Sequence, residues 1–173
     1  MLVLSRAEVE AVLDLDQLVD ALAAAHADLS AGRASMPTRI AARVDQRDAA
    51  LLAMPAYLPS AGALTTKLVT LFPQNEGTTT PTHQAVVLVF DPETGTPQAL
   101  LDGTAITALR TAAASALSVR LLAREDATVL ALLGTGVQAQ SHARAIARVR
   151  RLTEIRVASR DQGRAAEIMR EVG

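Results

Sequence analysis

Three small residues at a fixed spacing, in the stretch "LLGTGVQAQSHARA", could bind a nucleotide phosphate. Gly134, Gly136 and Ala139 follow an apolar run and precede an alanine-rich segment. In a dinucleotide-binding turn, the first glycine permits the tight turn and the second lets the backbone approach the pyrophosphate. The alanine then lets the helix pack closely on the strand. The same spacing fits an ordinary strand-to-helix turn, so the motif alone leaves both interpretations open.

The end of the next predicted strand favours the nucleotide interpretation. The run "EIRVAS" ends at Ser159, roughly where such a unit carries the residue that contacts the ribose. A site for NAD usually has Asp or Glu there, whereas this sequence has Ser159 followed by Arg160. A hydroxyl and a guanidinium suit a 2′-phosphate, so the sequence predicts NADP as the cofactor, with NAD as the alternative. A plain turn with a surface arginine remains the other interpretation.

Three positively charged residues, Arg39, Lys67 and Arg110, lie in stretches without matching local acids. A cation in apolar surroundings is costly unless it is paired, so the three are consistent with an anion that arrives from elsewhere. The alternative for each is a side chain that reaches solvent or a remote acid. From the residues alone, this alternative is favoured for Arg39 and Lys67, and the two interpretations are even for Arg110.

The surrounding patterns predict the elements that position these residues. A Ser5–Glu8 capping box and a helical pattern up to Gly32 precede short β-prone runs between residues 37 and 101. Asp102 is expected to cap a helix over 104–123, after which a buried strand begins. The predicted fold class is α/β. An α+β sheet domain over 1–124 precedes an incomplete Rossmann-type βαβ domain over 125–173; the resemblance described below implies that the first domain binds the substrate and forms the dimer.

Composition excludes several other classes of function. The chain has 173 residues, a net charge of −1 and no cysteine, and half of its residues are hydrophobic. The absence of a basic cluster argues against nucleic acid, and the absence of thiols argues against disulfides and thiolate metal sites. No signal peptide and no long uninterrupted apolar stretch are evident. We therefore expect a cytoplasmic protein with no metal, no nucleic acid and no membrane among its partners.

Several separated motifs in the right order resemble the ornithine cyclodeaminase/mu-crystallin family. They are "MPAY", "ALTTKLVTLFPQN", "THQAVVLVFDPETGTPQALLDGTAITALRTAA" and the glycine-containing stretch above. The stretch "MPAYLPSAGALTTKLVTLF" is most similar to the mu-crystallin, or ketimine-reductase, branch. Deaminating members tend to carry a glutamate just before Met-Pro, where this chain has Leu51-Leu52-Ala53, and this departure argues against ornithine deamination.

The resemblance implies roles for the residues at matching positions. Binding of the substrate carboxylate falls on Arg39, Lys67 and Arg110, and catalysis on Lys67 and Arg110. Contacts to the cofactor fall near its nicotinamide half, along the phosphate loop and in the 2′-phosphate region. These residues are Thr82, His83, Arg110, Gly134, Gly136, Val137, Gln138, Ser159, Arg160 and Asp161.

The implied activity is NAD(P)H-dependent reduction of a cyclic imino acid, such as pyrroline-2-carboxylate or piperideine-2-carboxylate. The resemblance also implies a homodimer formed through the N-terminal sheet. Other activities remain open: ornithine cyclodeaminase, an enzyme like alanine dehydrogenase, a non-catalytic ligand-binding protein, or an inactive dimeric subunit. Family members are longer, and residues 127–173 supply only about half of a dinucleotide fold. We therefore expect a shortened chain with little or no turnover by itself.

Overall fold

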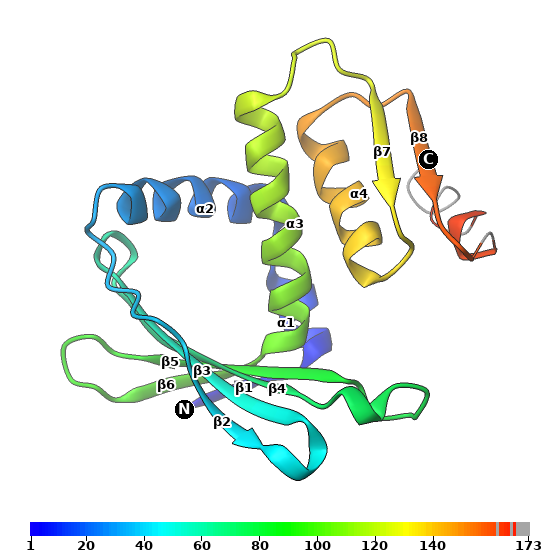
Figure 1. Ribbon diagram of the computed structural model, residues 1–173. Coiled ribbons are helices and arrows are strands. Elements are labelled where there is room, and N and C mark those ends of the chain that lie inside the picture. The colour runs from blue at the N-terminus through cyan, green and yellow to red at the C-terminus, as the bar shows by residue number, and fades with distance from the viewer. Residues whose placement is uncertain (162, 167, 169–173) are drawn as a thin grey trace. The chain divides into compact units, whose positions relative to one another are not determined.

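The computed structural model describes residues 1–161, 163–166 and 168 (Figure 1). It divides the chain into two compact units. Unit 1 comprises Met1–Leu13 and Ala24–Thr107, and unit 2 comprises Asp14–Ala23 and Ala108–Gly173. Helices α2 (Leu15–Ser30) and α3 (Gly103–Leu122) each contribute residues to both units. The domain boundary predicted at residue 124 therefore stays a prediction, because the two units are divided within α2 and α3 and not at residue 124.

Unit 1 contains one six-stranded mixed sheet. Its strands are β1 (Leu2–Leu4), β2 (Ile40–Val44), β3 (Ala49–Leu58), β4 (Ala63–Leu71), β5 (His83–Phe90) and β6 (Pro97–Asp102). They lie in the order β1-β6-β5-β4-β3-β2. The first pair is parallel and the others are antiparallel. The sheet predicted between residues 37 and 101 is confirmed, whereas the short strand β1 was not predicted.

Local hydrogen bonds explain where the strands turn. Between β5 and β6, the Asp91 carboxylate accepts hydrogen bonds from the backbone N–H groups of Glu93 and Thr94, at 2.8 and 3.0 Å. Such an Asx turn reverses the chain without help from the rest of the fold. These bonds also hold the pKa of Asp91 below its usual range, with Thr94 the larger contributor. The predicted hairpin at "DPETGTP" is therefore confirmed.

Side-chain caps begin the helices near the sheet. Ser5 and Glu8 form the predicted capping box at the start of α1 (Arg6–Val12). The Asp102 carboxylate accepts a hydrogen bond from the Ala105 N–H at 2.7 Å at the start of α3. Gly103 lets this helix approach β5 closely, because a Cβ there would lie 2.8 Å from the Ala85 carbonyl carbon. This close approach fixes the first turn of α3 against the sheet.

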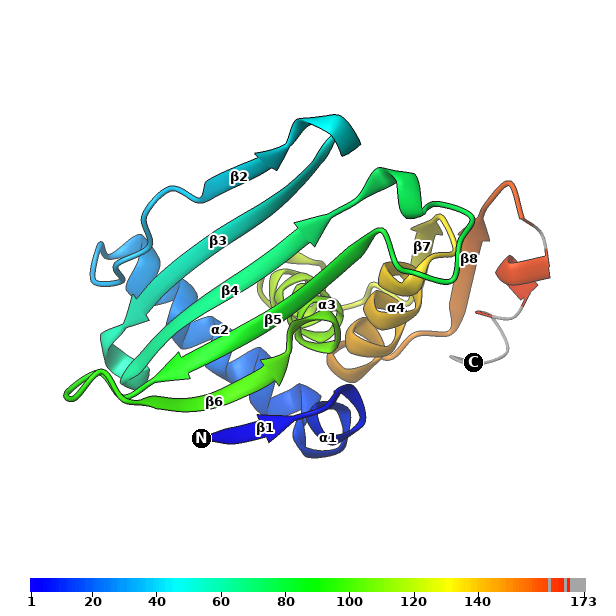
Figure 2. The ribbon, with the colours of Figure 1, turned by 90° about the horizontal axis from the view of Figure 1, so that it is seen from below.

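The two faces of the sheet differ in what covers them. Lys67 pairs with Met54 and Val87, and its side chain contacts the first turns of α3. On the opposite face, the pairing aligns Ile40, Ala53, Leu68 and Val86 across four strands. Figure 2 shows this second face toward the viewer, with no helix of unit 1 in front of it. Ile40 is 69 % exposed and Val86 38 %, so this face is apolar and open.

Unit 2 contains a strand–helix–strand element of Rossmann type. Strands β7 (Val129–Leu133) and β8 (Glu154–Ala158) pair in parallel, and α4 (Val137–Val149) connects them. Small residues allow α3 and α4 to pack closely: Ala112, Ala113 and Ala116 of α3 and Ala145 of α4 are fully buried in one cluster. The βαβ element predicted from residue 127 onward is confirmed, and Ala127–Leu133 does not join the first sheet.

Among the described residues, one helix is long and apolar enough to span a membrane by length and composition, namely α3. This is weak evidence for a membrane span, because core helices of globular domains meet the same criteria. The buried alanines of α3 belong to the core cluster of unit 2, which gives the helix a packing role.

Candidate functional site

The glycine-containing loop connects β7 to α4 in the geometry of a phosphate-binding turn. Gly134 has a φ of +105°, which L side chains rarely adopt, so glycine is required for the turn. Gly136 is the N-cap of α4, and no side chain caps the helix there. The backbone N–H groups at this end therefore lack the side-chain acceptor that usually satisfies them.

A hollow of about 290 Å³ lies at this end of α4, lined by Thr135, Gly136, Val137, Gln140 and Arg164. No protein atom lies within 4 Å of the position that a Gly136 Cβ would occupy, so the backbone is open to an approaching group. The first turn of α4 carries no acid, so the partial positive charge at the helix N-terminus is not neutralised locally. Uncapped N–H groups, open backbone and absence of an acid fit a dinucleotide phosphate.

The end of β8 is tied to this loop by hydroxyl groups. The Ser159 and Thr135 hydroxyl oxygens lie 3.2 Å apart, and the Ser159 hydroxyl accepts a hydrogen bond from the Asp161 N–H at 3.1 Å. Arg160 is exposed beside them. The structure thus brings Ser159 to the loop between β7 and α4.

Asp161 and Arg164 form a second feature of this end of β8. One Asp161 carboxylate oxygen accepts a hydrogen bond from the Arg164 backbone N–H at 3.1 Å, as in a helix cap. The other carboxylate oxygen lies 3.7 Å from the Arg164 guanidinium. Sequence analysis singled out Asp161 but missed Arg164, because the arginine follows the strand by several residues and looks like any surface cation. Its position four residues after Arg160 was the available signal.

Lys67 is the candidate cation that the fold holds most closely. It is half-buried in β4, and its ammonium donates a hydrogen bond to the Thr107 hydroxyl at 3.2 Å. Thr107 in turn donates to the Gly103 carbonyl at 2.6 Å, so its oxygen is oriented toward Lys67. These two hydrogen bonds position the Lys67 ammonium beside the first turns of α3.

The two candidate arginines both reach solvent, which is the alternative that the sequence favoured for Arg39 and left even for Arg110. Arg110 is exposed on α3, and Arg39 is exposed in the segment that precedes β2 rather than within a strand. An exposed guanidinium reaches water at little cost, so burial supplies no argument for a bound anion at these positions. Arg110 does follow Thr107 by three residues, a spacing that places two side chains on one face of a helix.

The two residues assigned to the nicotinamide half lie where β5 begins. His83 is the first residue of β5 and is half-buried, while Thr82 precedes it and is exposed. The Thr82 carbonyl accepts a hydrogen bond from the Phe72 N–H at 2.8 Å, which joins this segment to the end of β4. Among the described residues, no group of three or more His, Asp or Glu side chains could hold a metal ion.

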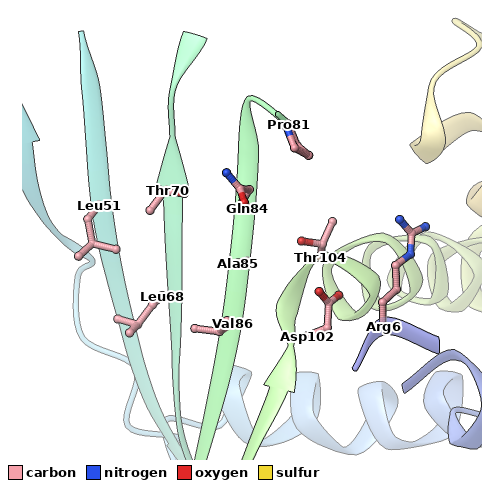
Figure 3. Close-up of a pocket in the computed structure, with 10 residues that line it drawn as sticks. All are labelled: Arg6, Leu51, Leu68, Thr70, Pro81, Gln84, Ala85, Val86, Asp102 and Thr104. Carbon is pink, nitrogen blue, oxygen red and sulfur yellow. The ribbon is translucent and has the colours of Figure 1, made fainter. Parts of the chain in front are cut away.

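A larger hollow of about 510 Å³ lies on the open face of the sheet in unit 1. Figure 3 shows Leu51, Leu68 and Val86 on three neighbouring strands, with Arg6 and Asp102 at one side. None of the residues assigned to substrate or cofactor lines this hollow. Its apolar floor continues the open face of the sheet.

Comparisons by sequence and by structure both find pyrroline-2-carboxylate reductases and alanine dehydrogenases. Mouse ketimine reductase mu-crystallin is 45 % identical over 128 residues, which are 72 % of this chain and 41 % of the mouse protein. The solved Δ(1)-pyrroline-2-carboxylate reductase of Thermococcus litoralis, in complex with NADH and L-proline, matches with a TM-score of 0.91 and 35 % identity. An archaeal alanine dehydrogenase dimer with bound NAD matches with a TM-score of 0.92 and 31 % identity.

The structural matches cover nearly all of this chain, but every match covers only part of the relative. The two structural matches cover 99 % of this chain, and 53 % of the reductase and 52 % of the dehydrogenase. The chain thus spans about half the length of the relatives it matches. The model of the ornithine cyclodeaminase/mu-crystallin family matches residues 1–173. On the phosphate-binding geometry and on these matches, the chain belongs to the ornithine cyclodeaminase/mu-crystallin family.

Proposed function

We propose that the protein reduces a cyclic imino acid with a nicotinamide dinucleotide as hydride donor. The uncapped N-terminus of α4 behind the Gly134–Gly136 turn carries this proposal, because it is built to receive a dinucleotide phosphate. The names of two relatives, a ketimine reductase and a pyrroline-2-carboxylate reductase, supply the substrate class.

In this proposal the residues of the chain bind and orient both molecules. The backbone N–H groups of Val137 and Gln138 face the phosphates, and Thr82 and His83 lie near the nicotinamide. The ammonium of Lys67 binds the substrate carboxylate, with Arg39 and Arg110 as further contacts. The nicotinamide, when bound, supplies the hydride. A cationic side chain bound to the substrate carboxylate fixes the orientation of the substrate. Its imine carbon is then held in one position relative to the hydride donor.

The finer assignment is NADP rather than NAD, at a site formed by Ser159, Arg160 and Asp161. A serine stands where NAD sites usually place a carboxylate, so no side chain at that position repels a 2′-phosphate. The solved relatives named above hold NADH or NAD, so NAD is the alternative cofactor.

The open face of the unit 1 sheet is the proposed surface for a homodimer. Its aligned apolar residues cross several strands, and exposed apolar area of this kind favours association with a partner. The archaeal alanine dehydrogenase that resembles this chain is a dimer. A second copy of the chain, placed face to face, would remove these side chains from water.

The proposal is tested by the products that the protein forms when expressed from its whole gene. We expect NADPH oxidation with pyrroline-2-carboxylate or piperideine-2-carboxylate and no NAD-dependent release of ammonia from ornithine. Release of ammonia without imine reduction would instead assign ornithine deamination. Pyruvate- and ammonia-dependent NADH oxidation without imine reduction would assign an alanine dehydrogenase. Cofactor binding with no turnover would identify a ligand-binding protein, and a dimer that binds neither molecule would identify an inactive subunit.

A further inference from the structure

Arg164 is a positively charged residue at the phosphate loop that the proposed function does not use. Its side chain lines the hollow with Thr135, Gly136, Val137 and Gln140, so it faces the same space as the N-terminus of α4. Among the described residues that line the hollow, it is the charged one. Arg160, which the sequence analysis assigned to the 2′-phosphate, does not line the hollow.

The position of Arg164 relative to β8 matches the ribose end of a dinucleotide. The ribose of the adenosine half is bound at the carboxyl end of the second strand of such a unit. Here that strand is β8, whose end is tied to the loop by the hydroxyl groups of Thr135 and Ser159. A cation beside this junction lies where a phosphate on the ribose 2′ oxygen would extend.

We propose that Arg164 determines the preference for a 2′-phosphorylated cofactor, an inference that rests on the proposed dinucleotide site. Its guanidinium forms charge-assisted hydrogen bonds to the 2′-phosphate, with Arg160 contributing from the solvent side. A dinucleotide that lacks this phosphate leaves Arg164 with its present neighbour, Asp161. The preference then depends on the competition between a phosphate, which carries almost two negative charges, and one carboxylate.

Asp161 has two separable effects in this arrangement. Its carboxylate caps the backbone at Arg164 and also lies 3.7 Å from the guanidinium. Asparagine is an equally good cap but carries no charge. Asp161→Asn therefore keeps the local backbone and removes both the competing partner of Arg164 and a negative charge near the phosphate. We expect this variant to bind a 2′-phosphate more tightly than the unmodified protein.

The experiment compares two probes that differ only in the 2′-phosphate: adenosine 2′,5′-bisphosphate and adenosine 5′-monophosphate. Their dissociation constants are measured by NMR titration of the full chain and its variants at low salt. Arg164→Met should lower the preference for the bisphosphate about tenfold, and Arg164→Lys should lower it less because the charge remains. Asp161→Asn should raise the preference about two- to fivefold. Arg160→Met should have a smaller effect than Arg164→Met.

Arg151→Met is the matched control, because this exposed arginine precedes β8 and so lies at the opposite end of the strand. It should leave the preference unchanged. Arg164 is itself 69 % exposed, so its loss should leave the unfolding temperature unchanged. If both probes bind but the preference survives Arg164→Met, the inference is wrong and the nucleotide site stands. If neither probe binds, the proposed dinucleotide site is wrong and the inference fails with it.

Discussion

Lys67 is the single residue whose local geometry most supports binding of a carboxylate. It is half-buried, and its ammonium donates a hydrogen bond to the Thr107 hydroxyl at 3.2 Å. Lys67→Met retains an extended apolar side chain but loses the charge. We expect the KM for the imino acid to rise about tenfold or more, because a charged hydrogen bond is lost, and the Kd for NADPH to stay unchanged. Steady-state kinetics and cofactor titration separate the two effects.

Arg43→Met is a suitable control for this substitution, since Arg43 is an exposed cation on the edge strand β2. It should leave both constants unchanged. Arg110→Ala should also impair use of the imino acid more than cofactor binding. This expectation rests on the family resemblance, because Arg110 is exposed and burial does not support it. A Lys67→Met protein with an unaltered KM would show that the carboxylate binds elsewhere.

Asp28 gives unit 1 a stability that depends on pH. It is 5 % exposed, and hydrogen bonds from Ser60 and then Arg33 hold its pKa below the usual range. A depressed pKa in the folded state contributes stability that is present above the unfolded value, about 3.9. This stability is lost as the pH falls through the folded value. The unfolding temperature should therefore decrease as the pH drops below about 4. Asp28→Asn should make the unfolding temperature less dependent on pH in this range. If the unfolding temperature of Asp28→Asn decreased at low pH as much as that of the unmodified protein, this role would be wrong.

The sequence correctly predicted residues whose structural role depends only on nearby residues in the chain. The Ser5–Glu8 box, the Asp102 cap and the glycine turn depend on neighbours within a few positions, and each forms as expected. The exposure of Arg110 and the placement of Arg164 depend on packing between distant segments, which spacing does not reveal. Arg164 was therefore missed, and the sequence left the two interpretations of Arg110 even.

Among the elements, the C-termini of α3 and α4 are joined by one guanidinium. Arg150 donates hydrogen bonds to the carbonyl groups of Val119 and Ala123, at 2.9 and 3.0 Å, near the end of α3. It also donates to the Val149 carbonyl at 2.9 Å. Cations at helix C-termini satisfy free carbonyl groups and interact favourably with the helix dipole. Arg150 thereby fixes the two helices of unit 2 to each other.

Arg150→Met should lower the free energy of unfolding by about 1.5–3 kcal/mol, because several charge-assisted hydrogen bonds are lost. Urea denaturation monitored by circular dichroism measures this change. Arg124→Met is the control, since the Arg124 side chain is 86 % exposed and makes only a 3.6 Å ion pair with Asp126. If Arg150→Met unfolds at the same urea concentration as the unmodified chain, the guanidinium does not hold the helices together.

Element types were predictable from the sequence to different degrees. Short β-prone runs with turn residues between them predicted the strands of the sheet, and apolar periodicity predicted α2. The Asp102 cap and the segment rich in Ala and Leu after it predicted α3. Strand β1 was missed because a strand of three residues shows too little pattern. Its parallel pairing with β6 joins segments that are far apart in the sequence. The order of the strands in the sheet likewise follows from tertiary packing.

For the whole molecule, the open face of the unit 1 sheet predicts a dimer. Val86→Lys places a charge in the middle strands of that face, where it would be buried against a second copy at high cost. We expect the variant to become monomeric in light scattering at micromolar concentration. Val12→Lys on α1 is the control, because Val12 is 72 % exposed and lies on a helix rather than on this face. A dimer that survives Val86→Lys would place the interface on another surface.

The most direct test of the account is transfer of deuterium from the cofactor to the product. The protein expressed from its whole gene is incubated with NADPH that carries deuterium at the transferred position of C4 and with piperideine-2-carboxylate. Mass spectrometry and NMR then locate the label. The account predicts one deuterium on the carbon that bears the carboxylate, because that imine carbon accepts the hydride. Cyclic amino acid without deuterium, or no reduced product at all, would contradict it.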